Sequence, residues 1–300
     1  MENTSPANFL QAELVLDAKA ELGEGAFWHP QEQRLYWVDI EGKKLHLYDP
    51  ATGQDRTIDV GERIGTVVPT PDGKALVALQ NGIHLLHLGT EELTLIANPL
   101  ESEDIRFNDG KCDPAGRFWV GSMHLEQEEN AAALYRMNLD GSVQKILSGK
   151  TISNGIVWTA DRKTMYYIDT PTRQVTAYDY DHATGDISNP RVAVEVPEEA
   201  GNPDGMAIDA EDKLWVAHYG GHAVIRYDPE TGERMQKIEL SAPNVTSCAF
   251  GGEDLDTLYI TTAREGMDEG ELEKYPQSGG LFWVKPGVRG AVFTLFKGSL

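Results

Sequence analysis

Four side chains that carry oxygen lie far apart in the sequence, and a glycine follows each of them within two residues. They are Glu24, Asn108, Asn154 and Asp204, followed by Gly25, Gly110, Gly155 and Gly205. Two carboxylates and two amide carbonyls are hard oxygen ligands, which suit calcium, magnesium or manganese. The set contains no cysteine or histidine, which argues against a structural zinc site. If the fold brings these residues together, they could hold one divalent cation.

Each of these residues also has a simpler explanation. Asn154-Gly155 and Asp204-Gly205 are common sequences of hairpin turns, and Glu24 alone could be a surface carboxylate. Their shared spacing weakens that explanation, because every member of the set lies ten or eleven residues before a short apolar strand. A turn has no need to recur at a fixed distance from a strand. The spacing therefore favours a repeated architecture that places these oxygens in equivalent positions.

Short apolar strands recur along the whole chain at a nearly constant interval. They begin at Leu35, Ala75, Phe118, Met165, Leu214 and Leu258, which gives steps of 40, 43, 47, 49 and 44 residues. This interval is typical of propellers whose blades contain four strands. Tyr, Trp, Val and Ile are concentrated in these segments and helical periodicity is nearly absent, which favours sheet. We therefore predict an all-β chain that folds as a six-bladed β-propeller with four-stranded blades and an axial metal site.

A β-sandwich of short strands is the alternative fold, but a sandwich has no reason to keep one interval through the whole chain. In a propeller the innermost strands line the central channel, so equivalent positions of different blades converge on the axis. The close approach of strands at such a channel would also explain the glycines. The aligned positions are Glu24, Gly65, Asn108, Asn154, Asp204 and Ser247, and five of them carry a side-chain oxygen.

The two ends of the chain must meet to close the ring. We expect the apolar residues around 13–16 to pair beside the C-terminal segment AVFTLF, residues 291–296, which would leave few exposed strand edges. The sequence therefore predicts an N-terminal tail over residues 1–12 and a single propeller domain over residues 13–300.

The composition excludes several classes of partner. The 300 residues include 26 basic and 48 acidic residues, a net charge of −22 at pH 7, so the chain should repel nucleic acid and anionic membrane surfaces. The first twenty residues lack a signal-peptide pattern and no apolar run could span a bilayer, so we expect a cytoplasmic protein. Cys112 and Cys248 form no CxxC pair, and GxSxG, HExxH, P-loop and Rossmann motifs are absent.

Longer segments of the chain resemble regucalcin and the bacterial gluconolactonase-like sugar lactonases, from about Leu14 to Val292. The segments that carry the resemblance are ELGEGAFWHP, RFNDGKCDPAGRFWVGSM, ISNGIVW, NPDGMAIDAEDKLWVAHYGG, TSCAFGG and AREGMDE. The resemblance implies a six-bladed propeller with one divalent metal ion, which could be calcium, zinc, manganese or magnesium. It also implies that Glu24, Asn154 and Asp204 hold this ion together with water molecules.

The same resemblance implies how a substrate would be bound. Arg106, Asn108 and Glu126 would hold the hydroxyls and the ring of a sugar lactone, and Asp204 would be the general base. Asn108 thereby moves from the metal ligands to a contact with the substrate. The sequence departs from animal regucalcin in HLEQEENAAALYRM, which is several residues shorter between Glu126 and the following strand. That segment is expected to form the loop that covers the substrate.

These observations predict a divalent-metal-dependent enzyme that hydrolyses gluconolactone-like aldonolactones to aldonic acids. The metal would polarise the carbonyl while Asp204 accepts a proton from the attacking water. The alternatives are a calcium-binding regulatory protein of the regucalcin type, a metal-dependent phosphotriesterase or other esterase, and a scaffold for protein partners. The expected partner is a small sugar lactone, and the expected state is a monomer or a weak homo-oligomer.

Overall fold

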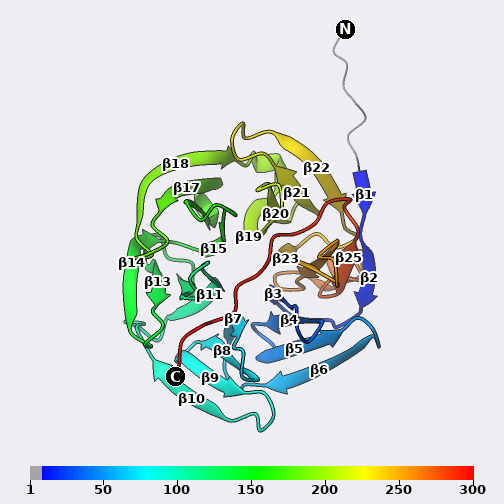
Figure 1. Cartoon of the computed structure of the whole chain (residues 1–300). Coiled ribbons are helices and arrows are strands. Elements are labelled where there is room, and N and C mark those ends of the chain that lie inside the picture. The colour runs from blue at the N-terminus through cyan, green and yellow to red at the C-terminus, as the bar shows by residue number, and fades with distance from the viewer. Residues whose placement is uncertain (1–8) are drawn as a thin grey trace.

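Residues 9–300, the part of the chain that this computed structural model describes, contain twenty-five short strands arranged in six sheets around a central axis (Figure 1). Five sheets have four strands and the sixth has five. The prediction of a six-bladed β-propeller with four-stranded blades is therefore confirmed. Of the helices in these residues, none has the length and apolar composition needed to cross a membrane.

The first five blades run from the axis to the rim in the order of the sequence, the sixth takes its outer strand from the start of the chain, and the innermost strands contact one another around the ring. The innermost strands are β3 (Gly23–His29), β7 (Ile64–Pro69), β11 (Ile105–Cys112), β15 (Ser153–Trp158), β19 (Asn202–Ile208) and β23 (Val245–Gly251). The second strands are β4 (Arg34–Asp39), β8 (Lys74–Leu79), β12 (Phe118–His124), β16 (Thr164–Asp169), β20 (Leu214–Tyr219) and β24 (Thr257–Thr262). The third strands are β5 (Lys44–Asp49), β9 (Gly82–His87), β13 (Ala132–Met137), β17 (Gln174–Tyr180), β21 (Ala223–Tyr227) and β25 (Leu281–Val284). The outer strands are β6 (Gln54–Asp59), β10 (Leu93–Ala97), β14 (Val143–Lys150), β18 (Ile187–Glu195), β22 (Arg234–Glu239) and β2 (Glu13–Leu16).

Burial follows this order from the axis outwards. Every residue of β3, β7 and β11 is buried, whereas β6 and β10 are mostly exposed. Both faces of each innermost strand lie inside the ring, so even the polar residues of these strands are buried, whereas the outer strands keep a polar face in water. The hydrophobic core therefore lies between the blades, around the axis.

The ring closes where the N-terminal strand completes the last blade. β2 pairs antiparallel with β25, with Glu13 opposite Trp283 and Leu14 opposite Phe282. The prediction that residues 13–16 pair beside AVFTLF was wrong in its partner, because residues 291–296 form no strand. Few strand edges stay exposed at the junction, because β2, from the start of the chain, covers the outer edge of the sheet formed by β23, β24 and β25.

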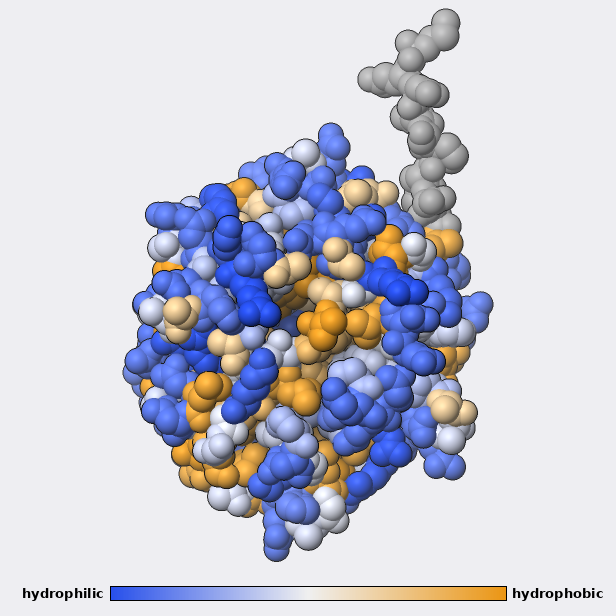
Figure 2. All heavy atoms as spheres, in the orientation of Figure 1, coloured by the Kyte–Doolittle hydropathy of each residue, from blue (hydrophilic) through white to orange (hydrophobic). Residues whose placement is uncertain are grey.

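Residues 291–296 instead cross the ring as an irregular segment, drawn in red over the middle of Figure 1. Phe296 is fully buried, and the ring of Phe293 lies 5.3 Å from that of Phe27. The backbone N–H of Ala291 donates to the Ile208 carbonyl, which joins the segment to β19. Apolar residues also gather in the middle of this face in Figure 2, inside a largely hydrophilic rim. The apolar pattern of this segment thus reflects burial across the blades and not pairing in a sheet.

Part of the predicted N-terminal tail belongs to a strand. β1 (Phe9–Gln11) pairs in parallel with β22 and adds a fifth strand to that blade. Residues 1–8 of the predicted tail lie outside the described residues. The division into a tail and one propeller domain stays a prediction.

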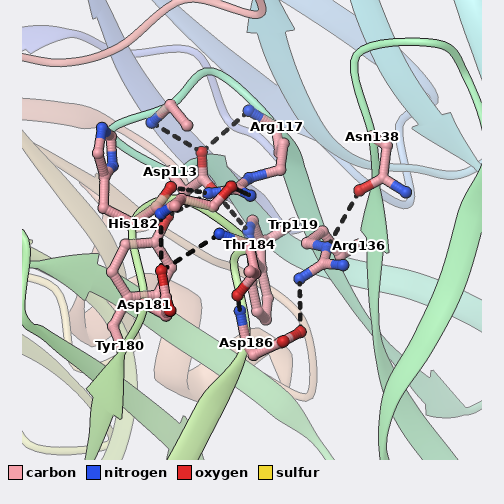
Figure 3. Close-up of polar contacts among 12 residues, drawn as sticks. Asp113, Arg117, Trp119, Arg136, Asn138, Tyr180, Asp181, His182, Thr184 and Asp186 are labelled. Carbon is pink, nitrogen blue, oxygen red and sulfur yellow. Dashed lines mark hydrogen bonds and ion pairs between the residues drawn. The ribbon is translucent and has the colours of Figure 1, made fainter.

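A buried ion pair connects two neighbouring blades (Figure 3). The Asp113 carboxylate accepts hydrogen bonds from Arg117 Nε at 2.6 Å and from Trp119 Nε1 at 3.0 Å. Arg117 also donates to the hydroxyl of Tyr180 and to the His182 carbonyl, both in the adjacent blade. Because Asp113 is fully buried, its charge depends on these partners.

We expect Asp113→Ala to destabilise the fold by about 3–5 kcal/mol, because the substitution leaves Arg117 buried and unpaired and removes the acceptor of Trp119. The free energy of unfolding, measured in urea, checks this value. Asp256→Ala is the matched control, since the exposed pair of Asp256 with Lys285 should contribute under about 1 kcal/mol. Equal losses in the two variants would contradict the structural role of Asp113.

Candidate functional site

Each innermost strand has an irregularity near its start, where its pairing with the second strand shifts register. The shifts lie at Glu24/Phe27, Ile64/Thr66, Phe107/Gly110, Asn154/Ile156, Pro203/Met206 and Val245/Ser247. Such β-bulges turn a side chain away from the direction that regular pleating would give it. The bulges coincide with the positions that the repeat aligns in the sequence. The six innermost strands therefore change the direction of their side chains at equivalent positions along the channel.

Glycines beside these bulges allow neighbouring innermost strands to approach closely. A Cβ atom on Gly155 would lie 2.6 Å from the Cβ of Met206 and 2.9 Å from the Asp204 carbonyl oxygen. A Cβ atom on Gly205 would lie 2.8 Å from the Ser247 hydroxyl. All three distances are shorter than van der Waals contact, so no other residue fits at either position. The predicted reason for these glycines is confirmed at both positions.

Five of the predicted site residues line one cavity of about 180 Å³ at the start of the innermost strands. They are Glu24, Arg106, Asn108, Asn154 and Asp204, and all five are buried. The rest of the lining was not predicted from the sequence and consists of Leu22, Met123, Gln127, Ile152, Thr170, Asn202, Tyr219 and Glu265.

The sixth predicted residue, Glu126, lies elsewhere. Glu126 is exposed and does not line the cavity, and its backbone N–H donates to the ring of His124. The next residue, Gln127, lines the cavity in its place. Ser247, which shares the aligned register, packs against Gly205 and also does not line the cavity.

Burial and mutual repulsion control the charges of the acidic side chains. Burial, together with the nearby Asp109 carboxylate, raises the pKa of Glu24 to about 8. Burial and the carboxylate of Glu24 raise the pKa of Asp204 well above its ordinary value. Without a cation, two such groups are most stable when they share a proton.

Asp109 is a third buried carboxylate, which the sequence reasoning missed. Its Oδ1 accepts from the Gly110 N–H at 2.8 Å, while its Oδ2 is buried without any partner in residues 9–300. Burial raises the pKa of Asp109, and the charge of Lys111 opposes this effect. The sequence did contain a signal for Asp109. In the other three blades the glycine follows the site residue directly, whereas Asp109 lies between Asn108 and Gly110.

The donor set fits a divalent cation. Across residues 9–300, no three His, Cys, Asp or Glu side chains converge closely enough to hold a metal by themselves, so a metal here would need the amide oxygen of Asn154 as well as Glu24 and Asp204. The carboxylates of Glu24, Asp204 and Asp109 repel one another, and one oxygen of Asp109 has no partner in the described part of the chain. A hard cation would offset this repulsion. Hard oxygen ligands of this kind suit calcium, magnesium or manganese.

Thr170 orients the Asn154 amide. Asn154 Nδ2 donates to Thr170 Oγ1 at 2.8 Å, and Thr170 Oγ1 in turn donates to the Pro203 carbonyl at 2.8 Å. This arrangement leaves Asn154 Oδ1 facing Asn108, whose Nδ2 lies 3.1 Å away. Thr170 belongs to a short 3-10 turn, η1 (Thr170–Thr172), that follows β16, which is why a search along the innermost strands did not find it.

Arg106 is the one cationic side chain of the lining. Its Nη1 donates to the Phe107 carbonyl at 3.0 Å and to Asn108 Oδ1 at 2.7 Å, whereas Nε and Nη2 have no acceptor within residues 9–300. Asn108 is engaged on its other side as well, since Nδ2 also donates to the Ser153 carbonyl. Asn108 therefore holds Arg106 in place and leaves part of the guanidinium free for a ligand.

Comparison with known proteins identifies relatives that match 91–96% of the chain. Residues 22–264 match the family model described as SMP-30/gluconolactonase/LRE-like region. The proposed sugar lactone lactonase YvrE of Bacillus subtilis (strain 168) is 43% identical over 274 residues, 91% of this chain and 94% of that protein. Regucalcin of Xenopus laevis is 40% identical over 296 residues, 96% of this chain and 99% of that protein. The crystal structure of a calcium-binding protein, regucalcin, from Agrobacterium tumefaciens has a TM-score of 0.92 and 29% identity, and the match covers 96% of this chain and 98% of that one.

We expect Thr170→Val to weaken the binding of Mn²⁺ by about tenfold or more, because the Asn154 amide loses the acceptor that orients it. Calorimetric titration of the metal-free protein measures the affinity. Thr172→Val is the matched control, since Thr172 lies in the same turn but bonds only to the Asp169 carbonyl. The same affinity in both variants would show that Thr170 does not position a ligand.

Glu24 should also make the stability of the metal-free protein depend on pH. The pKa of Glu24 is about 8 in the folded chain and near the ordinary value of 4.5 after unfolding, so between these values the folded state binds the extra proton. Stability therefore falls as pH rises through this range. We expect the Tm of the wild type to fall from pH 5 to pH 8 relative to that of Glu24→Gln. Parallel Tm profiles of the two proteins would contradict the raised pKa.

Proposed function

The chain belongs to the SMP-30/gluconolactonase/LRE-like family, and we propose that it hydrolyses sugar lactones to aldonic acids with the help of one divalent cation. The observation that carries the proposal is the meeting of the buried side chains of Glu24, Asn154 and Asp204 beside Arg106 in one cavity, although the four residues come from four different strands. The lactonase name of the Bacillus relative supports the reaction class.

Glu24, Asn154 and Asp204 would hold the cation, and three protein ligands leave room for water and substrate in its coordination sphere. When bound, the cation would polarise the lactone carbonyl and stabilise negative charge on the carbonyl oxygen. The affinity of this oxygen-only ligand set does not select one metal, so calcium, zinc, manganese and magnesium all remain candidates.

The residues of the chain would move the proton and orient the substrate. Asp204 accepts a proton from water as the water oxygen forms its bond to the carbonyl carbon. The bond from that carbon to the ring oxygen then breaks, and the ring oxygen becomes an alcohol by taking up the proton held by Asp204, which restores the Asp204 carboxylate. The free Nε and Nη2 of Arg106 would donate to the lactone oxygens, with Asn108 holding the guanidinium. A substrate contact by Glu126 stays a prediction, and Gln127 is the neighbour that lines the cavity.

A second candidate is a calcium-binding protein without turnover, which the description of the Agrobacterium structure favours. Arg106 distinguishes the two functions. A guanidinium with free donors next to the carboxylates weakens cation binding by repulsion, and it has a use only if an electron-rich ligand binds beside the metal. Acid release from glucono-δ-lactone in weak buffer, compared with and without Mn²⁺ or Ca²⁺, tests the proposal against spontaneous hydrolysis.

We expect Asp204→Ala to lower lactonase turnover by more than about a hundredfold, because the substitution removes both the general base and a metal ligand. The same acid-release assay measures the loss at saturating Mn²⁺. Asp254→Ala, on an exposed turn, is the control and should keep the wild-type rate. Near-normal turnover by Asp204→Ala would refute the assignment of Asp204.

A further inference from the structure

We infer that Glu265 makes the cavity selective for uncharged lactones and excludes lactones that carry a phosphate or a second carboxylate. This inference rests on the proposed function and concerns the range of its substrates. Glu265 follows β24 and is one of the lining residues that the sequence reasoning did not identify. Three lines of structural observation support it.

The backbone of Glu265 is fixed from three sides. Its N–H donates to the Glu21 carbonyl at 2.8 Å, and its carbonyl oxygen accepts from the Tyr219 hydroxyl at 3.0 Å and from Asn244 Nδ2 at 3.2 Å. Glu21 lies just before β3, Tyr219 is the last residue of β20, and Asn244 lies just before β23. The position of Glu265 at the cavity is therefore a built feature of the fold and not that of a loose surface loop.

The carboxylate of Glu265 has no counter-ion of its own. It makes no ion pair within 4.0 Å among residues 9–300, although it is only partly exposed. Burial raises the pKa of Glu265, and the positive charge of Arg106 across the cavity is the largest opposing influence. Arg106 and Glu265 thus balance each other through the space that a ligand would occupy.

The charges of the lining leave no surplus for an anionic substituent. Three carboxylates, Glu24, Asp204 and Glu265, face one cation, Arg106. A divalent cation would offset Glu24 and Asp204, and Glu265 offsets Arg106. Phosphate sites in proteins often bring together several guanidinium or ammonium groups, and Arg106 is the one side chain of this kind in the lining. A phosphate would therefore add negative charge that no free cation of the lining offsets, beside the carboxylate of Glu265 in a partly buried place, where repulsion is strong.

The test compares Glu265→Gln with the wild type on two probes, glucono-δ-lactone and 6-phosphoglucono-δ-lactone, both at saturating Mn²⁺. Gln keeps the shape of Glu and removes its charge, so an exclusion caused by size would be unchanged. We expect the ratio of kcat/KM for the phosphorylated lactone to that for the neutral lactone to rise by about tenfold or more, and the rise to shrink as salt is added. Glu230→Gln makes the same change of charge on an exposed turn far from the cavity and should leave the ratio unchanged.

An unchanged ratio in Glu265→Gln, or the same rise in Glu230→Gln, would overturn the inference. Failure of the proposed function gives a different result, because the wild type would then hydrolyse neither lactone. In that case calorimetric titration of the Mn²⁺-loaded protein with glucitol and with glucitol 6-phosphate makes the same comparison without turnover. A preference for glucitol that Glu265→Gln reduces about tenfold supports the charge selection, and equal preferences in the two proteins refute it.

Discussion

The site depends on holding carboxyl groups of like charge together at the axis of the ring. Glu24 and Asp204 come from the first and the fifth blade, and Asp109, from the third blade, lies near enough to raise the pKa of both. In an open chain these groups would separate, because each loses hydration and meets a neighbour of the same charge. Closure of the propeller prevents the separation. The strain of the arrangement is electrostatic, and a divalent cation would relieve it, so the proposed cation would be linked to the fold through this local repulsion.

Two different features of the fold produce this convergence. Bulges at the start of every innermost strand direct side chains into the channel, while Gly155 and Gly205 let the strands come close enough for those side chains to meet. At the other end of the channel, residues 291–296 cross the blades and bury Phe296. The channel therefore has one end built from polar side chains and another covered by an apolar segment. A ligand that needs oxygen donors can use only the first of these ends.

The sequence predicted the blades well because a four-stranded blade requires a set length of chain. It also predicted that Glu24, Asn108, Asn154 and Asp204 lie together, because equivalent residues of a closed ring must converge, and these four line one cavity. The role of any of them as a metal ligand stays a prediction. The sequence could not identify Asp109, since one inserted residue removes Asp109 from the aligned register, or Thr170, which acts from a turn outside the innermost strands. The segment 291–296 was predicted to be a strand because a buried irregular segment has the same apolar composition as a strand. An apolar composition indicates burial, and only the hydrogen-bonded partners distinguish a strand from a buried irregular segment.

The balance of charges around the cavity also bears on how the proposed reaction would end. Hydrolysis converts a neutral lactone into an aldonate anion, which would form between Arg106 and the carboxylates of Asp204 and Glu265. A cavity with surplus positive charge would hold that anion more tightly than the substrate, and release would then limit the rate. Here Glu265 offsets Arg106, so the cavity has no surplus positive charge. The net charge of −22 also repels the anion outside the cavity, and added salt shortens the range of this repulsion. The acidic surface and the acidic cavity would thus act in the same direction, because both disfavour the charged product and leave the uncharged substrate unaffected.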